Sequence, residues 1–392
     1  MMIKERSISL NRGNKMSVLD RAVLLLYSLY FILNPFYLWS SGLPQIADFF
    51  LVTGIVVYFV SFKFSIRFNK VSKPILLIGL LFISWITIVN LWSLSFTDDY
   101  DFLRSTAFYI YNFIIFIFII ALVNKYENQV YGITYKAILF SLTVELLVYL
   151  FVDQSSVRAI GSFNNPNQLG YYALLMLSYI IFLSKKIKVH AKWLIVGVLF
   201  STILSLASLS KAAIIAHIGL LIFYVFSKSS NKTLKRKVVI FLVFLSIGVG
   251  VIYHTTDIIQ SNSLISSVER RIASIGSDSD DNFGARGYYR IFEHPEYWIF
   301  GAGEGDYSRF KHKNIEFHST IGNIQVSYGF IGSLLFSLFI ILAMKNDKFE
   351  NWNIIFFLML YGLTHNGIRN TLFWIILALM SERKIFIKGE IK

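Results

Sequence analysis

Cysteine is absent from this chain of 392 residues, proline occurs five times, and charged residues make up 15% of the total. The lack of cysteine excludes disulfide bonds and thiolate metal sites. Soluble domains carry about 25% charged residues, so the scarcity of charge argues against a soluble domain. The sequence is instead 55% hydrophobic and 17% aromatic, and its mean hydropathy is +0.60.

The hydrophobic residues are gathered in long runs. A helix needs about 20 residues to cross the hydrocarbon layer of a bilayer. We count twelve candidate spans in the sequence, at roughly 22–39, 46–62, 74–94, 107–123, 133–152, 169–184, 193–209, 212–227, 238–253, 321–344, 353–364 and 371–381. The sequence therefore predicts an all-α fold, a polytopic transmembrane helical bundle of about twelve spans with one large extracytoplasmic loop that contains short helices.

The net charge of +14 would suit nucleic acid, but basic loops also orient membrane proteins. Most of the 37 lysines and arginines fall in alternate loops, starting with the N-terminal segment. Because such loops stay in the cytoplasm, we expect both termini to lie inside. Orientation by basic loops also accounts for the positive net charge, so we expect no nucleic-acid partner. We also expect no cleavable signal. The predicted organisation is 1–253 for spans one to nine, 254–320 for the outer loop with interfacial helices, and 321–392 for the last three spans and a cytoplasmic tail.

The outer loop contains two predicted short helices. One covers 263–276 and lies on the membrane surface, and the other covers 286–293 and stops before Pro295. Arg286 and Arg290 are four residues apart and would share a face of the second helix, where two guanidiniums can hold a diphosphate. Alternatively they pair with acidic neighbours or lipid headgroups. The glycine-rich segment 301–305 predicts a tight turn back to the membrane.

Two polar clusters lie at the starts of apolar spans. His318 opens one span, where a neutral imidazole can accept a proton from a sugar hydroxyl or simply make an interfacial hydrogen bond. Asn164, Asn165 and Asn167 surround Pro166, in a turn that can donate hydrogen bonds to a ligand or only start a helix. Arg158 precedes this turn on the same predicted side of the membrane.

Ionisable residues within spans are candidates for function. Glu145 and Lys211 are two of these, and an equal alternative is that they pair with each other or with the loop arginines. The acidic segment 97–101 suggests either a metal site or a solvated loop, of which the solvated loop is the better interpretation. No zinc-type spacing of histidine and carboxylate is present in the sequence.

Three of these segments, in this order, resemble the O-antigen ligase/polymerase family of bacterial envelope proteins. Segment 161–170 resembles the family's Gly-x-Phe-x-x-Pro-Asn pattern, and 284–303 resembles its Gly-Arg, His-Pro and Gly-x-Gly block. His318, followed by Gly329 and Gly332, resembles the histidine that precedes the family's last long span. Ser210-Lys211 stands where relatives often have Ser-Arg, so Lys211 departs from the pattern.

The resemblance implies a metal-independent, inverting glycosyltransferase that needs no cofactor. By position, Arg158 and Arg286 match arginines that hold the diphosphate, and His318 matches the proposed base. The substrate-binding residues expected in addition are Arg290, Asn164, Asn167, Lys211 and Tyr289. Tyr289 stands where the family usually has tryptophan, which leaves open whether Arg286 or Arg290 is the principal loop arginine.

The function expected from this resemblance is that of a Wzy-type polysaccharide polymerase in the bacterial cytoplasmic membrane. Its partners would be an undecaprenyl-diphosphate-linked oligosaccharide, membrane lipids and a chain-length regulator protein. The near alternative is an O-antigen ligase with the same donor. A polytopic flippase or secondary transporter is the alternative from another class, and the few intramembrane charges and the lack of a visible repeat count against it.

Overall fold

The structure is a computed structural model, and it describes residues 16–61, 72–153, 158–226, 236, 286–310 and 316–382. Within these ranges every regular element is a helix, as the sequence predicts. The α-helices are α1 (Val18–Leu33), α2 (Ile46–Ser61), α3 (Lys73–Thr97), α4 (Asp101–Tyr126), α5 (Asn128–Phe151), α6 (Pro166–Lys186), α7 (Ala191–Ala207), α8 (Lys211–Phe226), α12 (Tyr289–Glu293), α13 (Thr320–Asn346), α14 (Trp352–Gly362) and α15 (Thr371–Ser381). Three short 3₁₀ helices are η2 (Pro295–Tyr297), η3 (Tyr307–Arg309) and η4 (Gly367–Arg369).

Five of the described helices, α3, α4, α5, α6 and α13, are long and apolar enough to cross a membrane. Helices α2, α7, α8, α14 and α15 are apolar but have 10–17 residues. An 11-residue helix such as α14 or α15 is about 16 Å long, roughly half of the hydrocarbon layer. The structure thus supports a multi-pass membrane protein. The predicted span at 238–253 and the interfacial helix at 263–276 lie outside the described residues.

Successive helices run back and forth, so the connecting segments gather at two ends of the bundle. At the end we call the basic end, Lys186 pairs with Asp347 at 2.9 Å, and Lys125 pairs with Asp20 at 2.9 Å. At the opposite end, here the site end, Asp99 accepts a hydrogen bond from the backbone of Asp306. The predicted inside loops that the structure describes lie at the basic end, and the described parts of the predicted outside loops lie at the site end.

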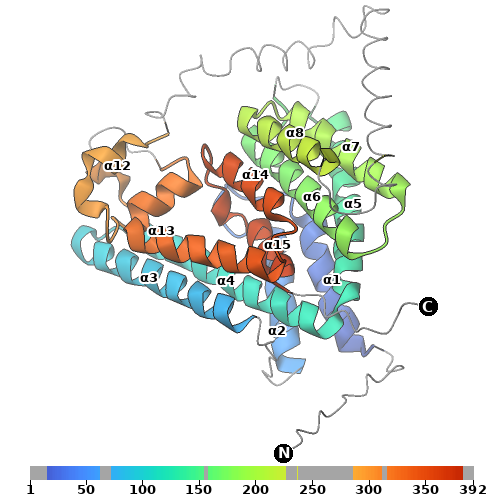
Figure 1. The fold of residues 1–392 in the computed structure, drawn as a ribbon, viewed down its shortest axis with the longest axis horizontal. Coiled ribbons are helices and arrows are strands. Elements are labelled where there is room, and N and C mark those ends of the chain that lie inside the picture. Colours follow the sequence, from blue (N-terminus) through green and yellow to red (C-terminus); the bar gives the residue numbers. More distant parts are fainter. Residues whose placement is uncertain are drawn as a thin grey trace, which may run out of the picture.

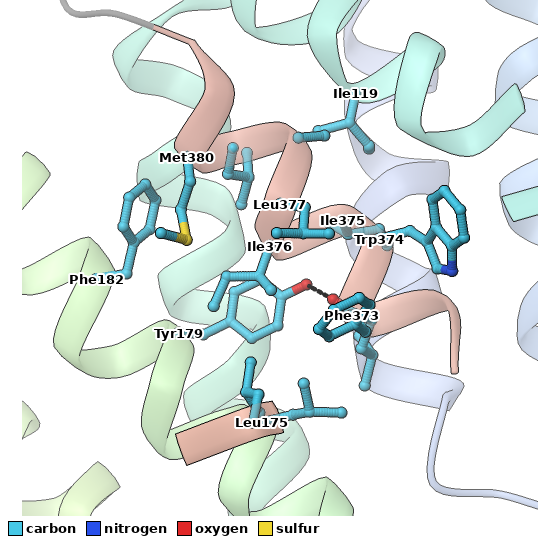
Figure 2. Close-up of a cluster of buried hydrophobic side chains, with 14 of the residues drawn as sticks. Ile119, Leu175, Tyr179, Phe182, Phe373, Trp374, Ile375, Ile376, Leu377 and Met380 are labelled. Carbon is cyan, nitrogen blue, oxygen red and sulfur yellow. Dashed lines mark hydrogen bonds between the residues drawn. The ribbon is translucent and has the colours of Figure 1, made fainter. Parts of the chain in front are cut away.

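Helices α14 and α15 lie in the middle of the molecule, between the α3–α13 pair and the group α5 to α8 (Figure 1). Every residue of α15 is buried. Figure 2 shows Tyr179 and Phe182 of α6 against Ile376 and Met380 of α15, and the Tyr179 hydroxyl donates to the Leu372 carbonyl at 2.6 Å. A buried hydroxyl without such an acceptor would be costly. This packing fixes the position of the loop that joins α14 to α15.

Helix α13 is broken at Gly329, whose φ of 65° and ψ of −166° are not helical. The break frees backbone groups, and the chain around the glycine-rich turn binds them. Ala302 donates to the Val326 carbonyl at 2.9 Å, and Gly303 donates to the Ser327 carbonyl at 2.7 Å. The turn predicted at 301–305 therefore brings residues 286–310, here called the outer segment after the loop predicted for them, onto the N-terminal third of α13.

Candidate functional site

The centre of the site end is the α14–α15 loop, residues 363–370. The preceding outer segment bonds it from one side. The Tyr288 hydroxyl donates to the Leu363 carbonyl at 2.6 Å, and a terminal nitrogen of Arg286 donates to the Thr364 carbonyl at 3.1 Å. The backbone of Thr320, at the start of α13, donates to the His365 carbonyl at 3.2 Å. These bonds hold the α14–α15 loop against the outer segment.

Helix α6 bonds the α14–α15 loop region from the other side. The Tyr361 hydroxyl donates to the Asn167 carbonyl at 3.1 Å, and the Tyr171 ring stacks on the Tyr361 ring at a centroid distance of 4.4 Å. The Asn167 side chain in turn accepts a hydrogen bond from the guanidinium of Arg158 at 3.0 Å. Arg158 also donates to the Ser208 carbonyl at 3.3 Å. Through Asn167 and Tyr361, Arg158 is thus linked to the end of α14 that leads into the loop bonded by Arg286.

His365 lies where these two sides meet. Its ring stacks on Tyr361 with centroids 4.7 Å apart and an interplanar angle of 15°. Burial and the positive charges of Arg286, His318 and Arg158 lower the pKa of His365 to about 3. Such charge effects weaken beyond roughly 8–10 Å. The three residues expected to be catalytic, which come from distant parts of the chain, therefore all lie near a histidine that sequence reasoning missed.

His318 is exposed and precedes α13, whose first turn is capped by Ser319. The surrounding protein partly desolvates its ring and lowers its pKa. The nearby arginines, among them Arg286, lower this pKa further, and Glu316 opposes them. The lowered pKa favours the neutral ring that a proton acceptor needs. Among the described residues, no hydrogen bond orients its ring.

The prediction that Arg286 and Arg290 share a helix face is wrong. Helix α12 starts at Tyr289, because Gly287 has a φ of 85° and interrupts the predicted helix after Arg286. Arg290 is 2% exposed. Its guanidinium lies 4.7 Å from the ring centre of Phe310, and three more rings lie within 6 Å, those of Tyr289, Tyr307 and Phe317. Arg286, in contrast, faces the α14–α15 loop.

The remaining predicted binding residues lie at varying places on the site end. Lys211 is the first residue of α8 and follows the turn to which Arg158 bonds. Tyr289 belongs to the aromatic surroundings of Arg290. Asn164 is exposed, and its amide donates to the Trp39 carbonyl at 2.9 Å, which turns it toward the α1–α2 connection.

The Asn-Pro turn also starts a helix, which is the second of the two roles considered for it. Asn165 is the N-cap of α6, and its side chain accepts from the backbone of Gln168 at 3.0 Å. Pro166 occupies the first helical position, where its missing N–H costs nothing. This turn therefore starts a helix, and its neighbour Asn167 presents the polar groups that reach the site.

Among the residues that the structure describes, Glu145 does not pair with Lys211 or with an arginine, as considered above. Its carboxylate accepts hydrogen bonds from the backbone of Ser162, at 3.0 Å, and from the Ser162 hydroxyl. Gly161 allows this approach, because a Cβ there would lie 1.9 Å from the carboxylate.

In the acidic segment 97–101, the Asp99 carboxylate accepts a hydrogen bond from the backbone of Asp306 and so binds the outer segment. No group of three metal-ligating side chains occurs in the part of the chain that the structure describes.

A buried ion pair beside the site also escaped sequence reasoning. Glu304 is fully buried, and Arg369 of the α14–α15 loop binds it. The Tyr328 hydroxyl donates to the same carboxylate at 2.8 Å. Burial alone would raise the pKa of Glu304, but the Arg369 charge and these hydrogen bonds hold it below its usual value. From the sequence, Glu304 was part of a turn and an acidic neighbour with which Arg286 and Arg290 could pair, and no spacing linked it to Arg369. A second carboxylate, that of Glu316, also contacts Arg369.

Comparisons with known proteins do not identify the chain: no protein-family model matches it, and no curated protein matches it.

Proposed function

We propose that this protein is a polysaccharide polymerase. It transfers a glycan from an undecaprenyl-diphosphate-linked donor to a lipid-linked acceptor sugar at the outer face of the cytoplasmic membrane. The proposal is supported by the positions of Arg158, Arg286 and His318, whose charges all act on His365 of the α14–α15 loop, at one end of an apolar helical bundle.

Two arginines on opposite sides of one loop suit a diphosphate. Guanidinium groups bind phosphate oxygens in pairs, and their charge is retained at any physiological pH. In glycosyl transfer, negative charge grows on the diphosphate as it leaves the sugar. Arg158 and Arg286, already fixed by hydrogen bonds to the protein, are placed to stabilise that charge without reorganisation. Lys211 adds a third cation from the start of α8.

The acceptor hydroxyl must lose a proton as it attacks, and a neutral imidazole can take it. The resemblance assigns this role to His318, which is exposed at the site end and whose lowered pKa favours the neutral ring. Attack from the side opposite the leaving diphosphate inverts the anomeric centre. Both substrates are held by lipid anchors in the same membrane, so the site gains the advantage of proximity.

The test uses purified protein, a synthetic undecaprenyl-diphosphate repeat unit and EDTA, with gel analysis of the products. We expect a ladder of chain lengths from the natural sequence and none from Arg286→Ala or His318→Ala. The matched control is His190→Ala, because His190 is an exposed histidine before α7 at the basic end. Absence of a ladder from the folded natural protein contradicts the polymerase. A single product that requires an added non-polymerising acceptor would favour the ligase.

A further inference from the structure

Several polar groups beside the α14–α15 loop lack partners within the described ranges. Both side-chain atoms of Asn366, its Oδ1 and its Nδ2, are buried without a hydrogen bond, and so is Nε of Arg286. Nε2 of the neighbouring His365 also has no hydrogen bond among those residues. Buried polar groups in proteins are almost always bonded, so a cluster of exceptions indicates a place for a polar ligand.

The hydrogen bonds of Thr364 define the tautomer of His365. The Thr364 hydroxyl donates its one hydrogen to the Tyr361 carbonyl at 3.3 Å, and the same oxygen lies 2.9 Å from Nδ1 of His365. Both bonds form together only if Nδ1 carries the proton and donates it to Thr364. Nε2 then has a free lone pair. Stacking on Tyr361 holds the plane of the ring.

We propose, on the basis of the transferase function above, that His365 is the proton acceptor of the reaction and that Asn366 binds the acceptor sugar beside it. His318 then acts as a substrate-binding residue at the exposed edge of the site. A base oriented by a third group is the usual arrangement for activating a hydroxyl nucleophile, and Thr364 is that third group for His365.

In the transfer, two bonds break and two form. The O–H bond of the acceptor sugar breaks and its proton goes to Nε2 of His365. The freed oxygen pair forms the bond to the anomeric carbon of the donor. The bond between that carbon and the diphosphate oxygen breaks, and its electron pair leaves with the diphosphate, which Arg158 and Arg286 face. The imidazolium then releases its proton to water, and the site returns to its initial state.

The charges around His365 link its basicity to donor binding. Arg286, His318 and Arg158 disfavour the imidazolium in the free protein. Farther out, His318 is itself flanked by Glu316, Arg290 and Arg369. A diphosphate bound at Arg158 and Arg286 cancels much of their field, because an opposite charge within a few ångströms favours the charged form of a base. His365 becomes an effective base when the donor is present.

The experiment measures kcat and KM of the full-length protein, reconstituted with the synthetic donor and acceptor, for His365→Gln, His318→Gln and the control His190→Gln. We expect His365→Gln to lose roughly 10²–10⁴-fold in kcat with little change in donor affinity, as for loss of a general base. His318→Gln should instead act mainly on KM, so that the ladder missing in the assay above reflects weak substrate binding and returns at saturating substrate. In His365→Ala, added imidazole should restore part of kcat, which it would not do for a merely structural residue.

Thr364→Val provides a second test if His365 variants fold poorly, because it keeps the shape of the side chain and removes the oxygen that orients the ring. It should lower kcat and leave donor binding intact. Natural kcat in His365→Gln, or loss of donor binding without loss of kcat, overturns the assignment of His365 alone. If the natural protein binds undecaprenyl diphosphate but forms no product, the transferase function itself fails, and the assignment fails with it.

Discussion

Arg286 and Arg290 are separated by three residues, yet their side chains have different surroundings. Arg290 is buried, and aromatic rings surround its guanidinium, with Phe310 the nearest at 4.7 Å. Arg286 lies beside the α14–α15 loop with a buried nitrogen that has no partner among the described residues. A desolvated cation over aromatic faces stabilises a fold, whereas an incompletely bonded guanidinium beside a second arginine suits an anion.

The two arginines should therefore respond oppositely to truncation. Arg290→Ala should lower the free energy of unfolding by about 2 kcal/mol or more through lost cation–π contacts. Arg286→Ala should leave thermal unfolding nearly unchanged and weaken binding of undecaprenyl diphosphate at least about tenfold, which is about 1.4 kcal/mol. Thermal unfolding and ligand binding in detergent check both. Equal destabilisation by the two changes would contradict this division of roles.

The pH dependence of the reaction should report the charges around His365. In the free protein, burial and the nearby cations lower the pKa of His365 to about 3, so it is neutral throughout the physiological range. Bound diphosphate raises this pKa. As the pH falls, His365 therefore becomes protonated, and can no longer accept a proton, at a higher pH in the complex than in the free protein. The acid limb of kcat, which reports the complex, should lie at higher pH than that of kcat/KM. Coincident acid limbs would contradict the coupling. His365→Gln should lose this separation.

At the scale of elements, the break in α13 depends on glycine. Gly329 has a positive φ, and a Cβ there would lie 2.3 Å from the Ile299 carbonyl oxygen. Gly329→Ala should thus disturb the docking of the outer segment and lower the thermal midpoint, since both strain and a clash act against it. The control is Gly132→Ala in α5, where a Cβ meets nothing within 4 Å. There alanine should be neutral or stabilise by about 0.5–1 kcal/mol. Equal midpoints for the two variants would contradict the requirement.

Hydrophobic runs predicted the helices well, because burial in an apolar layer depends on local composition. The predicted segment 46–62 corresponds to α2 (Ile46–Ser61), and 371–381 corresponds to α15. Local backbone effects were harder to foresee: spacing predicted one helix from Arg286, and Gly287 interrupts it. His365 could not be identified because nothing in a short loop sequence reveals which distant side chains surround it. Arg158, Arg286 and His318 were singled out because they matched a pattern, and tertiary packing brings them together.

At the scale of the whole molecule, the Glu304–Arg369 pair connects the outer segment to the helices. Glu304 is bonded by Tyr328 of α13 and by Arg369 of the α14–α15 loop. Removing one partner from a buried ion pair leaves a buried charge and costs about 3–5 kcal/mol. Glu304→Gln and Arg369→Met should each reduce the yield and thermal midpoint of folded protein. The double variant should be less destabilised than the sum of the single ones. An additive double variant would show that the pair is not coupled.

The sidedness of the molecule can be tested directly, because the chain contains no cysteine and a single introduced thiol is unique. Asn164 and His190 are both exposed and lie at the site end and the basic end of α6, respectively. Basic loops stay in the cytoplasm, so a membrane-impermeant maleimide added to intact cells should label Asn164→Cys and not His190→Cys. After lysis both should react. The reverse pattern would place Arg158, Arg286 and His365 at the cytoplasmic face, where a polymerase acting on outward-facing lipid-linked glycans could not work.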